Sequence, residues 1–315
     1  MGITNQSALA NVSVVFYTKF DELFVNRPGG AFQSYTEEVS IDTKTVEHDV
    51  FEAMPVMRTW IGPKVFSDIR FTNQTFTVKQ YERSFAIKRL DVVTDRTGMT
   101  ERRISNFLTN PNSQIQDKIC FDYLVTNPTG YDGSAIYSAT HPRGPAGATQ
   151  SNTTTSALGY TTFEDAMVSQ SELRDENGES FQITPNVLRV GPKLLQIAME
   201  VTGSDKPLSM DSSGASGTTS SVVAATKTVN AWGGGKVDVV LDKRMVGTYD
   251  DYWFLDDTTQ GAKPVILYTL RAPEPVEQTA MDSESRFNLD ELRFSIEMDG
   301  MPAAGAWQPT FAGIL

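Results

Sequence analysis

The segment from residue 56 to residue 93 constrains the fold of this chain most. Two stretches of it alternate apolar with polar or small side chains, one around Phe76 and Val78 and one around Phe85 and Ile87. A period of two is typical of β-strands that bury one face. The pattern therefore predicts a long hairpin-like segment. Because an isolated hairpin is marginal in water, this one has to lie on its own core or on a neighbouring subunit.

The same segment carries scattered basic residues, although the whole chain has a formal net charge of -12. Opposite charges across an interface steer and register association. We therefore predict contacts with acidic surface on a neighbour; a solvated strand face is the alternative. Trp60, Tyr81 and Phe85 are predicted to be apolar anchors of the segment, with burial in the subunit's own core as the alternative. The basic residues in this prediction are Lys64, Arg70, Lys79, Arg83, Lys88 and Arg89.

Chain length and cysteine usage bound the architecture. The 315 residues exceed the roughly 250–300 at which one core stops growing, so we expect two lobes or one lobe with long extensions. The one cysteine, Cys120, excludes an intrachain disulfide and fits a reducing compartment. With two histidines besides, a structural zinc site is nearly excluded. We see no signal peptide and no membrane-spanning stretch, and the acidic balance argues against a protein that wraps nucleic acid through phosphate contacts.

The first half of the chain is predicted to mix an arm with helices. Residues 1–55 are interpreted as an extended or partly helical arm, with a frayed terminus as the alternative. A helical stripe covers 99–125, where Pro111 predicts a kink or break at Asn110. Thr161 and Glu164 predict a capping box for the next helix, and Gly178 its end.

The second half is predicted to be mostly strands. Pro185 opens a strand over 186–190, and Pro192 opens a helix that ends near 203. A Ser/Gly/Thr-rich mobile loop is expected over 204–221. Further strands are expected near 237–241, 252–255, 264–271 and 294–298, followed by a turn at Asp299-Gly300 and a last stretch containing Trp307 and Phe311. The class is α+β.

Catalytic and ligand-binding motifs are weak throughout. Cys120 follows the apolar helical stripe, so it is interpreted as a small buried hydrophobe. His141 precedes a proline, and the chain has no nucleophile elbow for it to serve. Residues 233–236 lack the first glycine and the Ser/Thr of a phosphate-binding loop, and 175–178 lack the ligand spacing of a calcium loop. We therefore predict no enzyme, no cofactor and no metal.

The form of the chain points to assembly. An arm, a basic hairpin and a polar loop are long extensions that cost ordering entropy and add little to one core. This entropy cost is offset where such segments become ordered by contacts with copies of the same chain. The pattern therefore indicates an assembly protein with obligate interfaces of roughly 2,000–5,000 Å².

Several short stretches, in order and at the right spacing, resemble one known family. From about Met54 to the C-terminus the chain is similar to the Mu-like prophage major head subunits (gpT-like), which have the HK97-like capsid fold. The first 50 or so residues carry no such similarity, and the 209–221 loop and Pro111 are not features that the family requires. The stretches that carry the resemblance are Met57–Gly62, Lys79–Phe85, Tyr131–Gly133, Thr140–Pro142, the 163–178 helix and turn, Pro185–Leu188, Pro192–Leu194, Trp253–Leu255 and Lys263–Leu267.

The resemblance implies a part for each segment. It implies an N-terminal arm at 1–55, an extended loop (E-loop) at 56–93, a peripheral domain with the spine helix at 94–184 plus 286–315, and an axial domain at 185–285. It also implies hexamers and pentamers of an icosahedral virion shell, assembled in the bacterial cytoplasm through a procapsid. Expected partners are copies of the chain itself, scaffold, portal and decoration proteins, and enclosed double-stranded DNA bound without sequence specificity.

Three alternatives stay open at this point. An encapsulin-like compartment shell shares the fold and would contain cargo in place of DNA. Another phage structural protein, such as a tail-tube or decoration subunit, predicts a mostly β chain. A hydrolase with paired carboxylates predicts a cleft that holds a perturbed acid, and no motif supports it.

Overall fold

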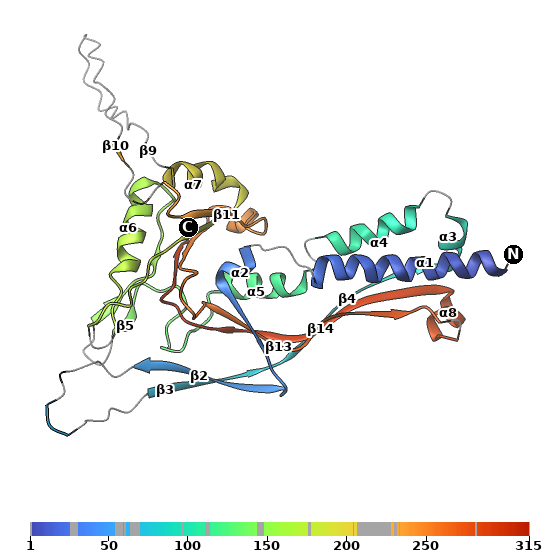
Figure 1. Cartoon of the computed structure of the whole chain (residues 1–315), viewed down its shortest axis with the longest axis horizontal. Helices are drawn as coiled ribbons and strands as arrows, with labels where there is room; N and C mark the ends of the chain where they lie inside the picture. The colour runs from blue at the N-terminus through green and yellow to red at the C-terminus, as the bar shows by residue number, and fades with distance from the viewer. Residues whose placement is uncertain are drawn as a thin grey trace, which may run out of the picture.

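The computed structural model describes residues 2–25, 31–53, 59, 61–63, 70–95, 98–110, 114–143, 148–175, 178–203, 205–206, 228–229, 232, 234–280 and 282–314. The molecule is elongated (Figure 1). Long strands covered by helices form one end, a second sheet flanked by two helices forms the other, and a hairpin extends from the middle. Within the described residues, no helix is long and apolar enough to cross a bilayer.

The long end is a four-stranded sheet covered on one face by helices. Its strands are β1 (Thr36–Ser40), β13 (Val265–Gln278), β14 (Glu291–Ala304) and β4 (Lys79–Lys88), in the order β1-β13-β14-β4. β1 runs parallel to β13, and the other pairs are antiparallel. Helices α1 (Gly2–Phe20) and α4 (Met99–Thr109) pack together over this sheet (Figure 1). A π-helical turn, Asp21–Val25, continues α1.

The core of this end lies between the apolar face of the strands, which repeats every two residues, and the apolar face of the helices, which repeats every three to four. On β14, Leu292, Phe294, Ile296 and Met298 alternate with polar residues and are buried against the helices. On α1, Phe16 is fully buried. Burying a side chain of this size contributes about 1.5–3 kcal/mol, so the apolar face of the sheet holds α1 and α4 in place.

The second sheet has five strands. Their order is β11 (Asp238–Leu241), β8 (Val187–Val190), β12 (Trp253–Asp256), β15 (Thr310–Gly313) and β7 (Thr153–Thr154). Helix α6 (Tyr160–Ser171) and helix α7 (Leu195–Val201), which a 3-10 turn at Pro192–Leu194 precedes, flank it. Gly313 is required here, because a Cβ at that position would lie 1.9 Å from the indole nitrogen of Trp253.

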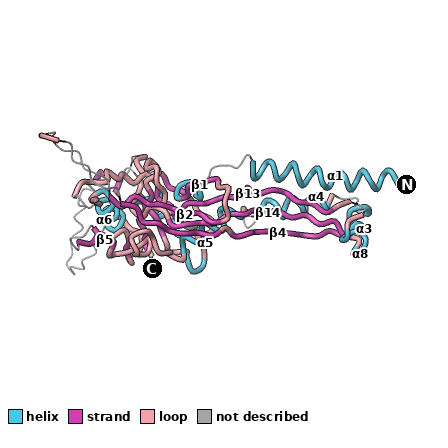
Figure 2. The backbone as a smooth tube through the Cα atoms, turned by 90° about the horizontal axis from the view of Figure 1, so that it is seen from below, coloured by secondary structure: helices cyan, strands magenta, loops and turns pink. Residues whose placement is uncertain are grey.

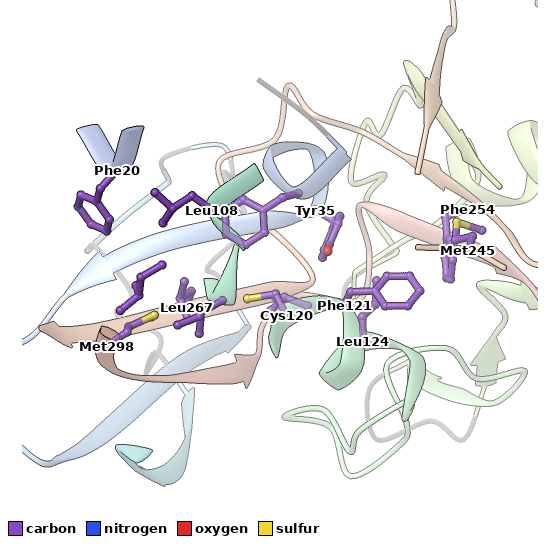
Figure 3. Packing of buried hydrophobic residues seen from close by; sticks show 14 of the residues in the cluster. Phe20, Tyr35, Leu108, Cys120, Phe121, Leu124, Met245, Phe254, Leu267 and Met298 are labelled. Carbon is purple, nitrogen blue, oxygen red and sulfur yellow. The ribbon is translucent and has the colours of Figure 1, made fainter. Parts of the chain in front are cut away.

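Helix α5 (Ile115–Val125) lies where the two sheets meet. Figure 3 shows its Cys120 beside Leu267 of the first sheet, while Phe121 and Leu124 extend toward Met245 and Phe254. The free thiol of Cys120 is buried, as the sequence predicted. One apolar cluster therefore runs through α5 and joins both ends of the molecule.

The remaining elements are short, apart from one hairpin. It pairs β2 (Thr45–Ala53) with β3 (Arg70–Thr77). The short strands are β5 (His141–Arg143) with β6 (Ala148–Gln150), and β9 (Asp205–Lys206) with β10 (Thr228–Val229). The short helices are α2 (Ala31–Tyr35), α3 (Arg89–Thr94), α8 (Glu284–Leu289) and a 3-10 turn at Gly247–Tyr249.

Several sequence predictions are confirmed. The chain is α+β. The predicted helical stripe is broken as Pro111 requires, because α4 ends at Thr109 with Asn110 extended (ψ 130°) and α5 begins at Ile115. A strand and then a helix follow Pro185 and Pro192. The predicted mobile loop at 204–221 falls almost entirely outside the described residues.

The predicted hairpin was wrong in its pairing. The stretches around Phe76 and Phe85 do not pair with each other: β3 pairs with β2, and β4 pairs with β14 near the C-terminus. Residues 45–53, which were assigned to the arm, thus form half of the hairpin. Alternation shows that a stretch is a strand, but it does not show which strand lies beside it.

Other local predictions need correction. Asp299-Gly300 forms no turn, because β14 runs through it and Gly300 pairs with Thr269 beside a bulge. Gly159 rather than Thr161 precedes α6, with its N–H donated to the Thr162 hydroxyl at 2.8 Å. This helix ends at Ser171, and Gly178 lies in a later turn. The predicted domain boundaries stay predictions.

Candidate assembly surface

Strand β4 presents two different faces. Along it, Tyr81, Arg83, Phe85 and Ile87 are half-buried or buried and face the helices. The intervening residues Gln80, Glu82, Ser84, Ala86 and Lys88 are exposed on the other face of the sheet. The period of two on β4 thus separates a core face from an open face.

Phe85 belongs to an aromatic cluster within the subunit. Its ring centroid lies 4.3 Å from that of Phe107, 5.3 Å from that of Phe294 and 6.2 Å from that of Phe16. These rings come from β4, α4, β14 and α1. The alternative that the sequence left open, packing in the subunit's own core, describes much of the Phe85 environment, and a role as an inter-subunit anchor stays a prediction.

Arg83 and Tyr81 extend from the same face. The Arg83 guanidinium lies 4.5 Å above the centroid of the Phe107 ring, and burial lowers its pKa. Burial, with a smaller electrostatic effect of Cys120, raises the pKa of the Tyr81 phenol. Both side chains thus place their apolar stems or rings against the core of the subunit.

The other predicted contact residues are dispersed. Lys79 and Lys88 are exposed at the two ends of β4. Arg89 begins α3 and forms an ion pair with Asp290, with Nε 2.7 Å from Oδ1; their hydrogen bond raises the pKa of Arg89 and lowers that of Asp290. Arg70 begins β3. Trp60 and Lys64 lie outside the described residues.

The open face of the sheet carries an acidic row that the sequence analysis missed. Glu82, Glu297 and Glu274 lie at directly paired positions on β4, β14 and β13. Like charges at paired positions repel each other. Arg271 offsets this, with Nη1 2.7 Å from Glu274 and 3.2 Å from Glu297. The row became recognisable only when the strand registers were known.

The far end of this sheet exposes apolar side chains. Leu90 on α3 is 60% exposed, and Phe287 and Leu289 on α8 are 87% and 54% exposed. Both helices lie at the end of the molecule opposite the five-stranded sheet (Figure 1). Exposed large apolar side chains that lie close together are typical of interaction surfaces.

A buried arginine joins helix α2 to the five-stranded sheet. The Arg189 guanidinium on β8 lies 4.2 Å from the Tyr35 ring centroid and 4.3 Å from that of Phe254, with Nε 3.3 Å from an Asp256 oxygen. Burial, the largest single cause, lowers its pKa, but the electrostatic effects of Asp256, Tyr137, Tyr35 and Asp242 together outweigh burial and raise the pKa above its usual value. Arg189 therefore stays charged and binds α2 to the five-stranded sheet.

His141 also has a structural environment. The ring stacks on Trp307 with a centroid separation of 3.8 Å and is fully buried. Nδ1 lies 2.6 Å from an Asp132 oxygen, and Nε2 lies 3.1 Å from the Asn152 side-chain oxygen. Both nitrogens are thus engaged in holding the 126–152 loop. Within the described residues, no group of three His, Cys, Asp or Glu side chains could hold a metal ion.

Comparison with known proteins now identifies the family. Residues 9–163 match the model of the family described as "Mu-like prophage major head subunit gpT". Over these residues, just under half of its length, the chain is similar to this family. Members of this family are major head subunits of Mu-like prophages, so this head subunit is a structural component of a phage head and not an enzyme. A search of the curated proteins found no match.

Solved capsid structures share the fold of this head subunit. The procapsid protein of bacteriophage JBD30 has a TM-score of 0.50 at 16% identity, over 98% of this chain and 75% of that one. The mature capsid protein of bacteriophage PhiM1 has a TM-score of 0.54 at 12% identity, over 91% and 87%. The JBD30 capsid decorated with minor capsid protein trimers gives 0.45 at 14% identity, over 91% and 64%. The head subunit spans 65% of the chain in a further JBD30 capsid structure and 64% of the chain in the decorated one, which is just under two thirds of their length.

Proposed function

We propose that the head subunit forms hexamers and pentamers, and that the E-loop predicted at 56–93 corresponds to the hairpin β2–β3, which lies over an adjacent subunit, while β4 and α3 belong to the body. The observation that carries the proposal is the position of the hairpin β2–β3. Its two strands pair only with each other among the described residues, and it extends away from the body (Figure 1). A ribbon of this kind is stable where another surface covers it.

The root of the hairpin is fixed, which suits a segment that has to reach a neighbour. Phe76 and Val46 pack beside Tyr268 and Ile266, with ring centroids of Phe76 and Tyr268 6.5 Å apart. The Gln74 amide also donates to the Gly130 carbonyl at 3.0 Å. A fixed root lowers the ordering cost of docking the hairpin on a neighbour.

The remaining assignments extend this proposal. Residues 1–55 act as the N-terminal arm, 94–184 plus 286–315 as the peripheral domain and 185–285 as the axial domain. Scaffold, portal and decoration proteins are the further partners, and assembly takes place in the bacterial cytoplasm. The shell encloses double-stranded DNA without sequence-specific contacts, in keeping with the acidic chain.

The experiment is overexpression of the head subunit followed by negative-stain microscopy and sedimentation. Closed hollow particles are the expected result, and nucleic acid inside particles from phage-producing cells distinguishes a phage head from a cargo compartment. Subunits that stay monomeric at all concentrations would contradict the proposal.

The E-loop contact has its own test. Reversing two basic residues of the segment, Arg70→Glu with Lys79→Glu, should lower the particle yield while circular dichroism stays that of the wild type, because both residues are predicted to meet acidic surface on a neighbour. A wild-type particle yield from this double variant would remove the charged contact from the proposal.

A further inference from the structure

The outer part of the four-stranded sheet has two margins with different chemistry. β1 pairs with β13 only from Val265 to Thr269. Beyond that point three strands remain, and Figure 2 shows β13 and β4 along the two margins with β14 between them. A margin strand directs alternate backbone N–H and C=O groups outward, where another strand can pair with them.

The register shows which groups point outward. The Arg89 N–H donates to the Asp290 carbonyl at 2.9 Å, one step beyond the pair of Lys88 with Glu291. Since hydrogen-bonded and non-hydrogen-bonded pairs alternate in an antiparallel ladder, the odd-numbered residues of β4 bond to β14. The outward groups are those of the even-numbered residues, Gln80, Glu82, Ser84, Ala86 and Lys88.

The β13 margin is closed by prolines. The same alternation makes Glu274 and Val276 bond to β14, so the outward positions between and beside them are odd-numbered. Pro273 and Pro275 occupy two of these positions and have no N–H to donate. The β4 margin contains neither proline nor glycine over its whole length, and its even-numbered side chains are exposed. Only one of the two margins is thus built to accept a strand.

We propose that β4 pairs antiparallel with β4 of a second copy of this chain, in the register centred on Phe85. The outward groups then meet as hydrogen-bonded pairs, Glu82 with Lys88 of the second copy, Ser84 with its Ala86, and the reciprocal pairs. The contact joins the three-stranded parts of two sheets, one from each copy, into one continuous sheet across a two-fold axis.

Charge complementarity selects this partner and this register. The pairing places Glu82 directly opposite Lys88 twice, once on each side of the axis, and brings two small residues, Ser84 and Ala86, together between them. On the other face the two Phe85 rings become cross-strand neighbours, an arrangement favourable in sheets. A register centred on Ser84 instead places Glu82 opposite Ala86 and loses both ion pairs.

The symmetry of the contact gives it a place in the shell. This step rests on the proposed function. Contacts within a hexamer or pentamer are head-to-tail, whereas contacts across a two-fold axis use the same patch on both subunits. A self-complementary β4 margin is of the second kind, so it links neighbouring capsomers rather than subunits of one ring.

Charge reversal tests the pairing. Each single variant, Glu82→Lys or Lys88→Glu, places like charges opposite each other twice, so the shell yield should fall about tenfold or more. The double variant E82K/K88E restores opposite charges and should restore shells. Mixing the two single variants should also restore them, because each variant then faces a complementary partner. Gln80→Lys, on the same face just outside the paired residues, is the matched control and should assemble as the wild type does.

The subunit itself should tolerate the change at Glu82, whereas Lys88→Glu places like charges opposite each other at its pair with Glu291, so circular dichroism has to show that this variant is folded. Glu82 lies opposite Glu297 on β14, so a lysine there relieves a repulsion within the chain. Single variants that assemble like the wild type, or a double variant that assembles no better than the single ones, would overturn the proposal.

A cysteine pair provides a second measurement. In the variant S84C/A86C each cysteine faces the other type across the axis, at the Cα separation of about 5.5 Å that hydrogen-bonded pairs have and disulfides accept. Oxidised shells should contain covalent dimers on non-reducing gels, and shells of Gln80→Cys should not. If the wild type forms shells but oxidised shells of S84C/A86C contain no such dimers, the β4 pairing is wrong while the shell function stands. If no wild-type shells form, the shell function itself fails.

Discussion

At the scale of single residues, the buried arginine of β8 is the most consequential side chain of the head subunit. Arg189 lies between the Tyr35 and Phe254 rings, and Asp256 and Asp242 oppose its charge. Such a cluster links elements that lie far apart in the sequence. Removing its cation leaves two carboxylates buried without a counter-charge.

Arg189→Met should therefore destabilise the subunit by about 3–5 kcal/mol, the usual cost of breaking a buried pair by removing one partner. Urea unfolding of unassembled subunits measures the loss. Arg189→Lys retains the charge but loses the flat contact with the two rings, so it should fall between the wild type and the methionine variant. A methionine variant as stable as the wild type would show that the Arg189 cation does not stabilise this cluster.

Buried tyrosines give the subunit a defined response to alkali. Burial raises the pKa of Tyr123 and of Tyr268 to about 12. The neutral phenol is thus favoured by the fold, and the stability it contributes is fully present below pH 10 and is lost as the pH rises through about 12. Tyrosinate absorbance should show these groups titrating late in the folded protein and at ordinary pH in urea. A single titration near pH 10 under both conditions would contradict the burial.

At the scale of elements, the root of the hairpin decides whether the ribbon points at a neighbour. Phe76→Ala removes the contact with Tyr268, so it should lower the particle yield and cost the subunit about 1–3 kcal/mol, less than a fully buried phenylalanine because the ring is half-buried. Sedimentation measures the yield and urea unfolding the stability. Thr75→Ala, at the adjacent exposed position, is the control and should change neither; an equal loss from both variants would show that the root is not the cause.

Elements with local causes were predictable from the sequence. Pro111 predicts the end of α4, and Pro192 predicts the start of the 3-10 turn that precedes α7, because proline restricts its own φ and the conformation of the residue before it. Pairings over long sequence distances were not predictable. β4 pairs with β14, more than half the chain away, and the acidic row of Glu82, Glu297 and Glu274 exists only through that register. The sequence thus predicted that the candidate contact residues of β4 form a strand. Which of them face the core and which face outward became clear only from the strands and helices that pack beside β4.

At the scale of the whole molecule, the two ends of the head subunit differ in how much of their backbone other strands protect. The central strands β8, β12 and β14 have partners on both sides. The hairpin β2–β3 and the outer side of β4 have partners on one side only among the described residues. Local opening costs least where few contacts hold the backbone, so stability should be unequally distributed along the chain.

Amide hydrogen exchange should therefore divide the chain into two classes. In unassembled subunits the amides of β8, β12 and β14 should exchange slowly, and those of the hairpin and of Gln80, Glu82, Ser84 and Ala86 fast. In shells the second class should become slow, because neighbouring subunits then pair with or cover these groups, while the first class changes little. Mass spectrometry of peptides from subunits and shells measures both classes. Hairpin amides that are equally protected in the free subunit would mean that the ribbon is already stable alone, and that assembly does not depend on its burial against a neighbour.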